Sequence, residues 1–212
     1  MILRREDGET ITARERRDVV LLTERREISI TWSRYAPGER GPDLHVHREH
    51  TDAFYVLEGE VTFALGPGAD PISLPAGGFV AVPPNVVHAF ANEGSADASW
   101  LNFHAPDAGF ADYLRAARDG ADAGFDSFDR PADGGLPATG AIVTGPGEGE
   151  RLASGDGDVL LKGVLPELSV AEWTLRDRDL LDHGGLHYML DGPERALDIH
   201  APDGGFADRA RA

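Results

Sequence analysis

The sequence predicts an all-β protein, and two observations favour this fold class. Several short stretches alternate apolar and polar residues with a period of two, as in a half-buried β-strand. Glycine and proline are frequent, with 26 and 14 among 212 residues, and they separate these stretches at close intervals. Eight or more short strands between such turns are typical of a β-barrel or a β-sandwich.

The expected strands follow one another from residue 10 to residue 104. Residues 28–32 show the alternation plainly, because Ile28, Ile30 and Trp32 fall on one face of a strand. A turn at Glu58-Gly59 joins two apolar stretches and predicts a hairpin. In chain order, we expect strands at 10–13, 19–23, 28–32, 45–47, 52–57, 60–65, 72–74, 79–82, 86–91 and 100–104.

One short helix is expected after the last of these strands. Apolar side chains recur there at helical spacing, at Phe110, Tyr113, Leu114 and Ala117. This stripe predicts a helix over residues 110–118. The following residues, 120–139, are rich in Asp, Gly, Ala and Pro and predict a connector, and Phe125 and Phe128 indicate that it packs on the rest of the protein.

Three histidines and one aspartate stand at strand positions where their side chains can meet. His45 and His47 are separated by one residue, so on a strand both imidazoles point to the same face. Asp52 opens the next predicted strand, and His88 lies on a later one. Three imidazole nitrogens and one carboxylate oxygen are suitable ligands for a first-row divalent metal. We therefore predict a metal centre formed by His45, His47, Asp52 and His88.

Two stretches resemble the two signature motifs of the cupin superfamily, over roughly residues 27–105. The first motif is His-x-His, then Glu, then Gly, and it is matched by His45, His47, Asp52 and Gly59, with Asp in place of Glu. The second is Gly, Pro-x-Gly, His and Asn, and it is matched by Gly77, Pro83, His88 and Asn92. Asn85 replaces its inner glycine, and asparagine tolerates the left-handed backbone better than other non-glycine residues.

The resemblance implies a jelly-roll β-barrel that holds one divalent metal ion, Fe, Mn, Ni or Zn. Similarity to quercetin-dioxygenase-like cupins implies an enzyme, a dioxygenase-like oxidoreductase that uses O₂ on a small oxygen-rich organic molecule. Two alternatives remain open: a metal-dependent isomerase or lyase, and a non-catalytic cupin that binds a small molecule. The chain contains no cysteine, so thiolate ligands are excluded.

The identity of the fourth ligand is left open. Asp52 is one methylene shorter than the glutamate of the motif, and His50 is the rival fourth ligand if the chain bends after His47. His104 recurs as His200 in an internal repeat, which favours a structural role over one as an acid or base in the cavity. No residue is assigned as catalytic.

The C-terminal third repeats part of the preceding chain. Residues 104–112 return as residues 200–208 with one difference, Ala108 against Gly204. The two copies are offset by 140 residues at their beginning and by 96 at their end, so the second copy is about 44 residues shorter. The missing stretch corresponds to the strand of His45 and His47 and the hairpin after it.

These observations predict a two-domain cupin, or bicupin, with a shortened C-terminal copy. We expect an N-terminal cupin barrel with the metal site at 1–120, a connector at 121–140 and a shortened cupin-like repeat at 141–212. The repeat is expected to pack on the barrel or on a partner subunit. We expect no second metal centre in it, although His183 and His187 are available there as ligands.

The net charge and the hydropathy of the sequence limit the classes of molecule that we expect the protein to bind. A net charge of −17 argues against nucleic acid, whose phosphates would be repelled. The N-terminus lacks the apolar run of a signal peptide, and no membrane-spanning stretch is readable, so we expect a cytoplasmic protein with a small-molecule substrate. Because a shortened barrel leaves strand edges uncovered, we expect a homodimer.

Overall fold

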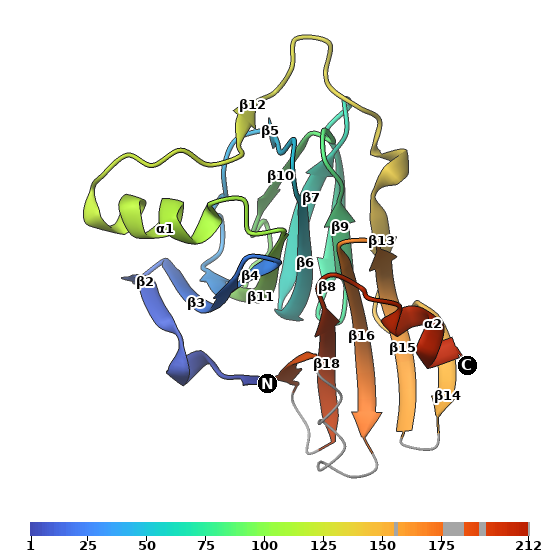
Figure 1. The fold of residues 1–212 in the computed structure, drawn as a ribbon. Coiled ribbons are helices and arrows are strands. Elements are labelled where there is room, and N and C mark those ends of the chain that lie inside the picture. The colour runs from blue at the N-terminus through green and yellow to red at the C-terminus, as the bar shows by residue number, and fades with distance from the viewer. Residues whose placement is uncertain (155–156, 176–184, 191–193, 212) are drawn as a thin grey trace.

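The protein is built from three β-sheets and two short helices (Figure 1). The structure is a computed structural model, and it describes residues 1–154, 157–175, 185–190 and 194–211. The predicted all-β class is confirmed, and the sheets contain seven, five and six strands within the described residues.

The seven-stranded sheet is the central layer. Its strands are β2 (Glu9–Arg14), β3 (Arg17–Arg25), β4 (Ile28–Tyr35), β6 (Thr51–Glu58), β9 (Phe79–Val82), β11 (Ala98–Ala105) and β13 (Ile142–Thr144). They are arranged in the order β13-β9-β6-β11-β4-β3-β2, and all neighbours are antiparallel.

The five-stranded sheet closes the jelly-roll barrel against one face of the central sheet. Its strands are β5 (His45–Val46), β7 (Glu60–Leu65), β8 (Asp70–Pro75), β10 (His88–Ala91) and β12 (Phe128–Asp129), in the order β12-β5-β10-β7-β8. Buried side chains from both sheets, such as Phe54, Phe63 and Trp100, form one continuous apolar cluster between them. The expected cupin-type jelly roll is therefore confirmed.

The six-stranded sheet covers the other face of the central sheet. Its strands are β1 (Ile2–Leu3), β14 (Glu150–Ser154), β15 (Gly157–Leu165), β16 (Leu168–Leu175), β17 (Leu186–Met189) and β18 (Arg195–His200), in the order β1-β17-β18-β16-β15-β14. Ile30 and Leu101 of the central sheet pack with Val170 and Leu197 of this sheet in a second apolar cluster. The central sheet is therefore buried on both faces.

The alternation in β4 determines what the barrel interior contains. Ile30 and Trp32 pack toward the six-stranded sheet, whereas Thr31 and Ser33 line a cavity inside the barrel. The apolar face of this strand thus points out of the barrel and the polar face points in. This arrangement leaves a polar wall inside the barrel, beside the predicted metal ligands.

Two α-helices and two turns of 3₁₀ helix complete the fold of the described residues. These elements are η1 (Arg5–Asp7), α1 (Phe110–Asp119), η2 (Ala138–Gly140) and α2 (Phe206–Arg211). The predicted helix over 110–118 is confirmed as α1, which lies beside β2 at one end of the barrel (Figure 1). Neither helix has the length and apolar composition that a membrane-spanning segment requires, among the residues described.

The repeat seen in the sequence is also a repeat in the structure. Asp107 accepts hydrogen bonds from the backbone N–H groups of residues 109 and 111 at the start of α1, at 3.0 and 3.2 Å. Asp203 does the same for residues 205 and 207 at the start of α2, at 2.9 and 3.2 Å. Both aspartates satisfy N–H groups that the helix leaves unpaired.

Strand pairing connects the three predicted parts of the chain. β1 pairs in parallel with β17, β12 of the predicted connector pairs with β5, and β13 pairs with β9. The boundaries 1–120, 121–140 and 141–212 remain a prediction.

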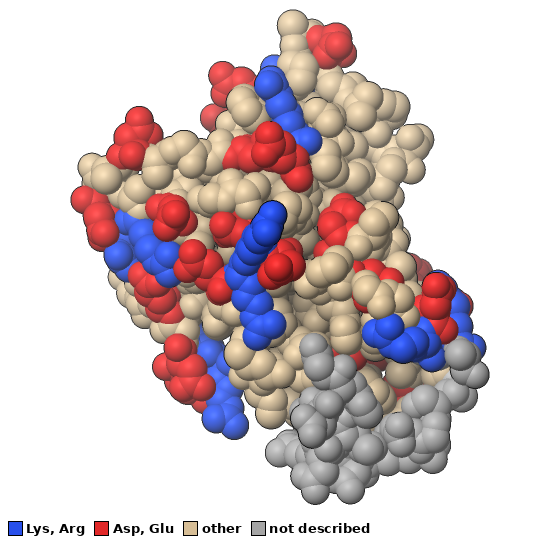
Figure 2. Space-filling view, in the orientation of Figure 1, with Lys and Arg blue, Asp and Glu red and all other residues tan. Residues whose placement is uncertain are grey.

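The surface carries acidic and basic side chains side by side (Figure 2), and Arg115 of α1 lies 2.8 Å from both Glu9 and Glu24.

Replacement of Leu101 by alanine tests the packing between the central and six-stranded sheets. Leu101 is fully buried in β11, and its truncation leaves a cavity, so we expect the free energy of unfolding to fall by about 2–5 kcal/mol. Leu136→Ala is the control, because Leu136 is 53% exposed and should lose less than about 1 kcal/mol. Urea denaturation measures both, and equal losses would contradict the assigned core.

Candidate metal centre

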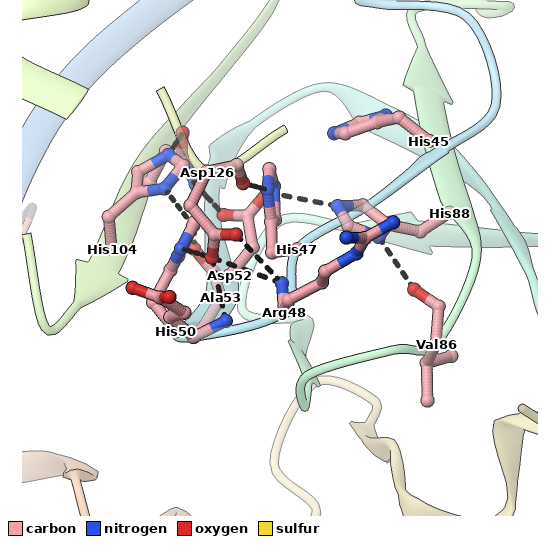
Figure 3. Close-up of polar contacts among 12 residues, drawn as sticks. His45, His47, Arg48, His50, Asp52, Ala53, Val86, His88, His104 and Asp126 are labelled. Carbon is pink, nitrogen blue, oxygen red and sulfur yellow. Dashed lines mark hydrogen bonds and ion pairs between the residues drawn. The ribbon is translucent and has the colours of Figure 1, made fainter. Parts of the chain in front are cut away.

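The four predicted ligands come together inside the barrel (Figure 3). His45 lies on β5, His47 directly follows it, and His88 on β10 pairs in register with His45. Asp52 reaches the same place from β6 of the facing sheet. All four residues are buried, and their ligand atoms lie within 4.8 Å of one another.

A backbone carbonyl holds each of the three imidazoles by its Nδ1 atom. The contacts join His45 to Asp43 O at 2.9 Å, His47 to Asp126 O at 2.5 Å and His88 to Val86 O at 3.1 Å. Because a carbonyl oxygen only accepts hydrogen bonds, Nδ1 of each ring must carry the proton. In the neutral ring, Nε2 then keeps a lone pair, as a metal-ligating histidine requires.

The Nε2 atoms face Asp52 and not a hydrogen-bond donor. His88 Nε2 lies 3.2 Å and His47 Nε2 lies 3.6 Å from Asp52 Oδ2. His47 Nε2 is buried and finds no hydrogen-bond partner in the described part of the chain. Lone pairs and a carboxylate that face one another in a buried space need a cation between them. The residues present therefore fit a divalent metal.

The protonation states also suit a metal. Burial, together with the neighbouring His88 and His47, lowers the pKa of His45 to about 4. His45 is therefore neutral near pH 7, which is the form that binds a metal. Burial of Asp52 opposes ionisation, but the nearby His104, His47 and His88 outweigh it and hold the pKa of Asp52 well below its usual value.

Asn102 orients the carboxylate of Asp52. Its Nδ2 group donates to Asp52 Oδ1 at 2.5 Å and to Ala53 O at 3.1 Å. The other carboxylate oxygen, Oδ2, is thereby turned toward His47 and His88. Although Asp52 is shorter than glutamate, its carboxylate still faces the imidazoles.

His50 and His104 form a second group beside the first, and this group shares His47 with it. His50 donates through Nδ1 to Asp126 Oδ2 at 2.8 Å, and its Nε2 lies 2.9 Å from His104 Nδ1. His104 Nε2 in turn lies 3.1 Å from Asn102 Oδ1, whose amide nitrogen is already used on Asp52. His50 thus contacts Asp126 and His104. The choice of Asp52 over His50 as the fourth ligand stays a prediction.

The contacts of the His50–His104 pair need one more proton than the two neutral rings carry. Burial, followed by the nearby His47, lowers the pKa of His50 to about 4, and burial lowers the pKa of His104 well below its usual value. Three contacts link Asp126, His50, His104 and Asn102 in that order, and the first and last of these residues can only accept there. Each contact needs one proton to become a hydrogen bond, whereas the two neutral rings carry only two N–H groups. The pair therefore has a place for one further proton.

Sequence reasoning missed part of this site. It favoured a structural role for His104, whereas the structure places His104 Nε2 3.6 Å from Asp52 Oδ1. It missed Asp126 entirely, although Asp126 also accepts hydrogen bonds from the backbone N–H groups of residues 48 and 49. The sequence held one periodic signal, because Asn102 precedes His104 by one strand period. For Asp126 it held only the neighbouring Phe125, which indicated that the connector packs on the protein.

A cavity of about 620 Å³ reaches the ligands from the side of α1. Thr31, Ser33 and Asn102 form a polar part of its wall. Its apolar part contains aromatic side chains, among them Trp100, Phe110, Tyr113 and Phe125. The site is therefore accessible to a small molecule with both oxygen atoms and an apolar body.

Known proteins share this fold. The cupin domain family model matches residues 31–104, which include all four predicted ligands. A Pseudomonas aeruginosa protein described as glyoxylate-induced matches 79% of this chain at a TM-score of 0.53 and 14% identity, and the protein Ylba from E. coli matches 81% at 0.54 and 14%. The alignments cover 59% and 62% of those two chains.

KdgF from Halomonas sp. matches 50% of this chain and 93% of its own length, with a TM-score of 0.44 and 14% identity. No curated protein matches the sequence. The jelly-roll barrel, the two motifs that meet inside it and the family match lead to one assignment: residues 31–104 form a cupin domain.

Proposed function

We propose that this protein is a metal-dependent enzyme that acts on a small oxygen-rich organic molecule. One divalent ion, Fe, Mn, Ni or Zn, would be held by the Nε2 atoms of His45, His47 and His88 and by the carboxylate of Asp52. The observation that supports this most strongly is the buried Nε2 atom of His47, which faces a carboxylate and has no donor near it in the described residues. Such a set of acceptors is stable when a cation completes it.

The leading reaction is dioxygenation of an enol or catechol-like substrate with O₂. When bound, the metal would supply Lewis-acid polarisation of the substrate oxygens and, if redox-active, electron transfer to O₂. The hydroxyl groups of Thr31 and Ser33 offer hydrogen bonds to substrate oxygens, and the rings of Phe110 and Phe125 offer an apolar wall. The cavity reaches His45, His47 and Asp52, which leaves room for a substrate beside the centre.

A second candidate is a metal-dependent isomerase or lyase, and the His50–His104 pair favours it. The pair lies next to Asp52 and has a place for one further proton, so it can take a proton from a bound substrate and return it elsewhere. Asp126 orients His50 through a 2.8 Å contact. Reactions of this class move a proton and consume no O₂.

Three further expectations stay predictions: a homodimer, a cytoplasmic location and the absence of a nucleic-acid partner. The six-stranded sheet ends at β14, which has no further neighbour among the described strands. A second copy of the chain that pairs with this edge would cover its unpaired backbone groups. If no turnover is found, the remaining alternative is a non-catalytic cupin that only binds its ligand.

The variant His47→Ala tests the ligand assignment. Because it removes the buried Nε2 lone pair, we expect bound metal to fall by one equivalent per chain while the fold is kept. Elemental analysis measures the metal, and circular dichroism checks the fold. The control is Arg48→Ala, since the Arg48 side chain lies over Phe128 and leaves the ligands untouched. Full metal content in folded His47→Ala would contradict the assignment.

Oxygen consumption separates the two reaction classes. The iron-loaded protein is mixed with a panel of enols and catechols in an oxygen electrode cell, with His47→Ala as the inactive control. The leading proposal expects O₂ uptake in step with substrate loss. Substrate turnover that continues without O₂ would support the isomerase or lyase instead, and would contradict dioxygenation.

The variant Asp126→Ala tests whether the connector is part of the site. Asp126 holds His50 and the backbone that follows His47, so its loss should weaken metal binding about 10–100-fold. Competition with a chelator measures the affinity. Asp122→Ala is the matched control, because Asp122 is exposed on the same connector. Equal affinities of the two variants would show that the Asp126 contacts do not support the centre.

A further inference from the structure

The cavity beside the barrel centre differs in charge from the rest of the protein. The chain has 37 acidic residues against 20 lysines and arginines, yet among the described residues three arginines and a single acidic residue line this cavity. The arginines are Arg14, Arg17 and Arg118, and the acidic residue is Asp52, one of the predicted metal ligands. A cavity with this lining attracts anions, although the protein as a whole repels them.

Strand register places Arg14 and Arg17 side by side at one end of the cavity. Arg14 on β2 pairs directly with Arg17 on β3, and Arg17 pairs with Tyr35 on β4. Side chains of directly paired residues point to the same face of a sheet. That face is the inner one, because Tyr35 and Ser33 of β4 line the cavity. The two guanidinium groups therefore share the inner face of the barrel.

The charge of Arg14 is not compensated, in contrast to those of the other two arginines. Arg17 lies 2.8 Å from Glu39 Oε1, and Arg118 lies 2.6 Å from Glu9 Oε1. No hydrogen bond or ion pair joins the Arg14 side chain to another residue that the structure describes. Like charges directly opposite each other in a sheet are destabilising. An anion between Arg14 and Arg17 would relieve this repulsion.

The wall between the arginines and the metal centre suits the body of an organic anion. β4 presents Thr31, Ser33 and Tyr35 to the cavity, and Thr31 pairs with Asn102, which holds the carboxylate of Asp52. Within the described chain, no hydrogen bond uses the hydroxyl groups of Thr31 and Ser33, so they are available to substrate oxygens. Thr31 and Tyr35 are four residues apart, roughly 13 Å along a strand. An acidic group at the arginine end would therefore lie away from the metal, with the rest of the molecule extending toward it.

We propose that the cavity binds an organic anion with a ring-containing body, and that its acidic group lies between Arg14 and Arg17. Phe90 and Trp100 line the cavity beside Tyr35, with ring centres 6.1 and 4.6 Å from that of Tyr35, and offer an apolar surface to the rings of the ligand. This inference rests on the proposed function only where it identifies the anion as the substrate.

The C-terminal repeat contributes no residue to this cavity among the residues described. Of the two histidines named in the repeat as available ligands, His187 is buried on β17 and His183 lies outside the described residues. The absence of a second metal centre in the repeat therefore stays a prediction.

Two fluorescent dyes that differ in one charged group test the proposal. 8-Anilinonaphthalene-1-sulfonate and N-phenyl-1-naphthylamine share their ring system, and only the first carries a sulfonate. Each dye is titrated into full-length wild type, Arg14→Ala and Arg4→Ala, and the fluorescence gives the Kd. We expect wild type to prefer the sulfonate dye, and Arg14→Ala to bind this dye about 5-fold more weakly without a change for the neutral dye. Arg4→Ala is the matched control and should behave as wild type, because Arg4 is exposed and does not line the cavity.

The variant Ala117→Trp locates the bound dyes. Ala117 lies on α1, lines the cavity and is exposed, so a tryptophan there narrows the cavity without entering the core. We expect this variant to weaken both dyes alike. Three results would each overturn the proposal: a neutral dye that binds wild type as tightly as the sulfonate dye, equal sulfonate affinities of Arg14→Ala and Arg4→Ala, or unchanged affinities in Ala117→Trp.

The variant His47→Ala separates this proposal from the function proposed for the barrel. Neither dye needs a metal, so we expect the variant to keep the preference for the sulfonate dye even where its metal is lost. A preference for the sulfonate dye in a wild-type protein without any turnover would support the anion site and reject the proposed reactions. Turnover of enols or catechols in a protein without this preference would support a reaction and reject the anion site.

Discussion

Three backbone carbonyl groups determine the chemistry of the barrel interior. They accept the Nδ1 protons of His45, His47 and His88 and thereby leave three Nε2 lone pairs, of which those of His47 and His88 face Asp52. Two of the carbonyls, from Asp43 and Val86, lie two residues before the histidine that they hold, but the third belongs to Asp126 in the distant connector. The orientation of the His47 ring thus requires the connector to fold back over the barrel. The same segment delivers the carboxylate that orients His50, so the orientations of His47 and His50 both depend on Asp126.

The central sheet links this site to the rest of the fold. Its strands direct polar side chains, such as Thr31 and Asn102, into the barrel, and apolar ones, such as Ile30 and Leu101, out of it. An apolar outer face is stable only if another layer covers it. The six-stranded sheet provides that layer, which explains why the C-terminal third stays packed on the barrel although it lacks the strand of His45 and His47. The outer face of this sheet therefore contributes the apolar packing, and its inner face lines the candidate site.

Most strands, the helix α1 and the convergence of His45, His47, Asp52 and His88 were predictable from the sequence, because alternation, turn residues and short residue spacings are local signals. Asp126 was not predictable in the same way, since its contact with His50 joins residues 76 positions apart and leaves no periodic trace. The position of His104 beside Asp52 was missed for a different reason. Its recurrence as His200 indicated a structural role, but the residue two positions earlier differs, Asn102 in one copy and Asp198 in the other. The same backbone position thus carries a neutral side chain in one copy and an acidic one in the other.

The central claim is that one cation lies between the Nε2 atoms of His45, His47 and His88 and the Oδ2 atom of Asp52. Anomalous diffraction from crystals of the metal-loaded protein, recorded at the absorption edge of the bound metal, tests it most directly. The account predicts a peak about 2.0–2.2 Å from those four atoms. Contradiction would come from a barrel interior without such a peak, with the three imidazoles turned away from one another.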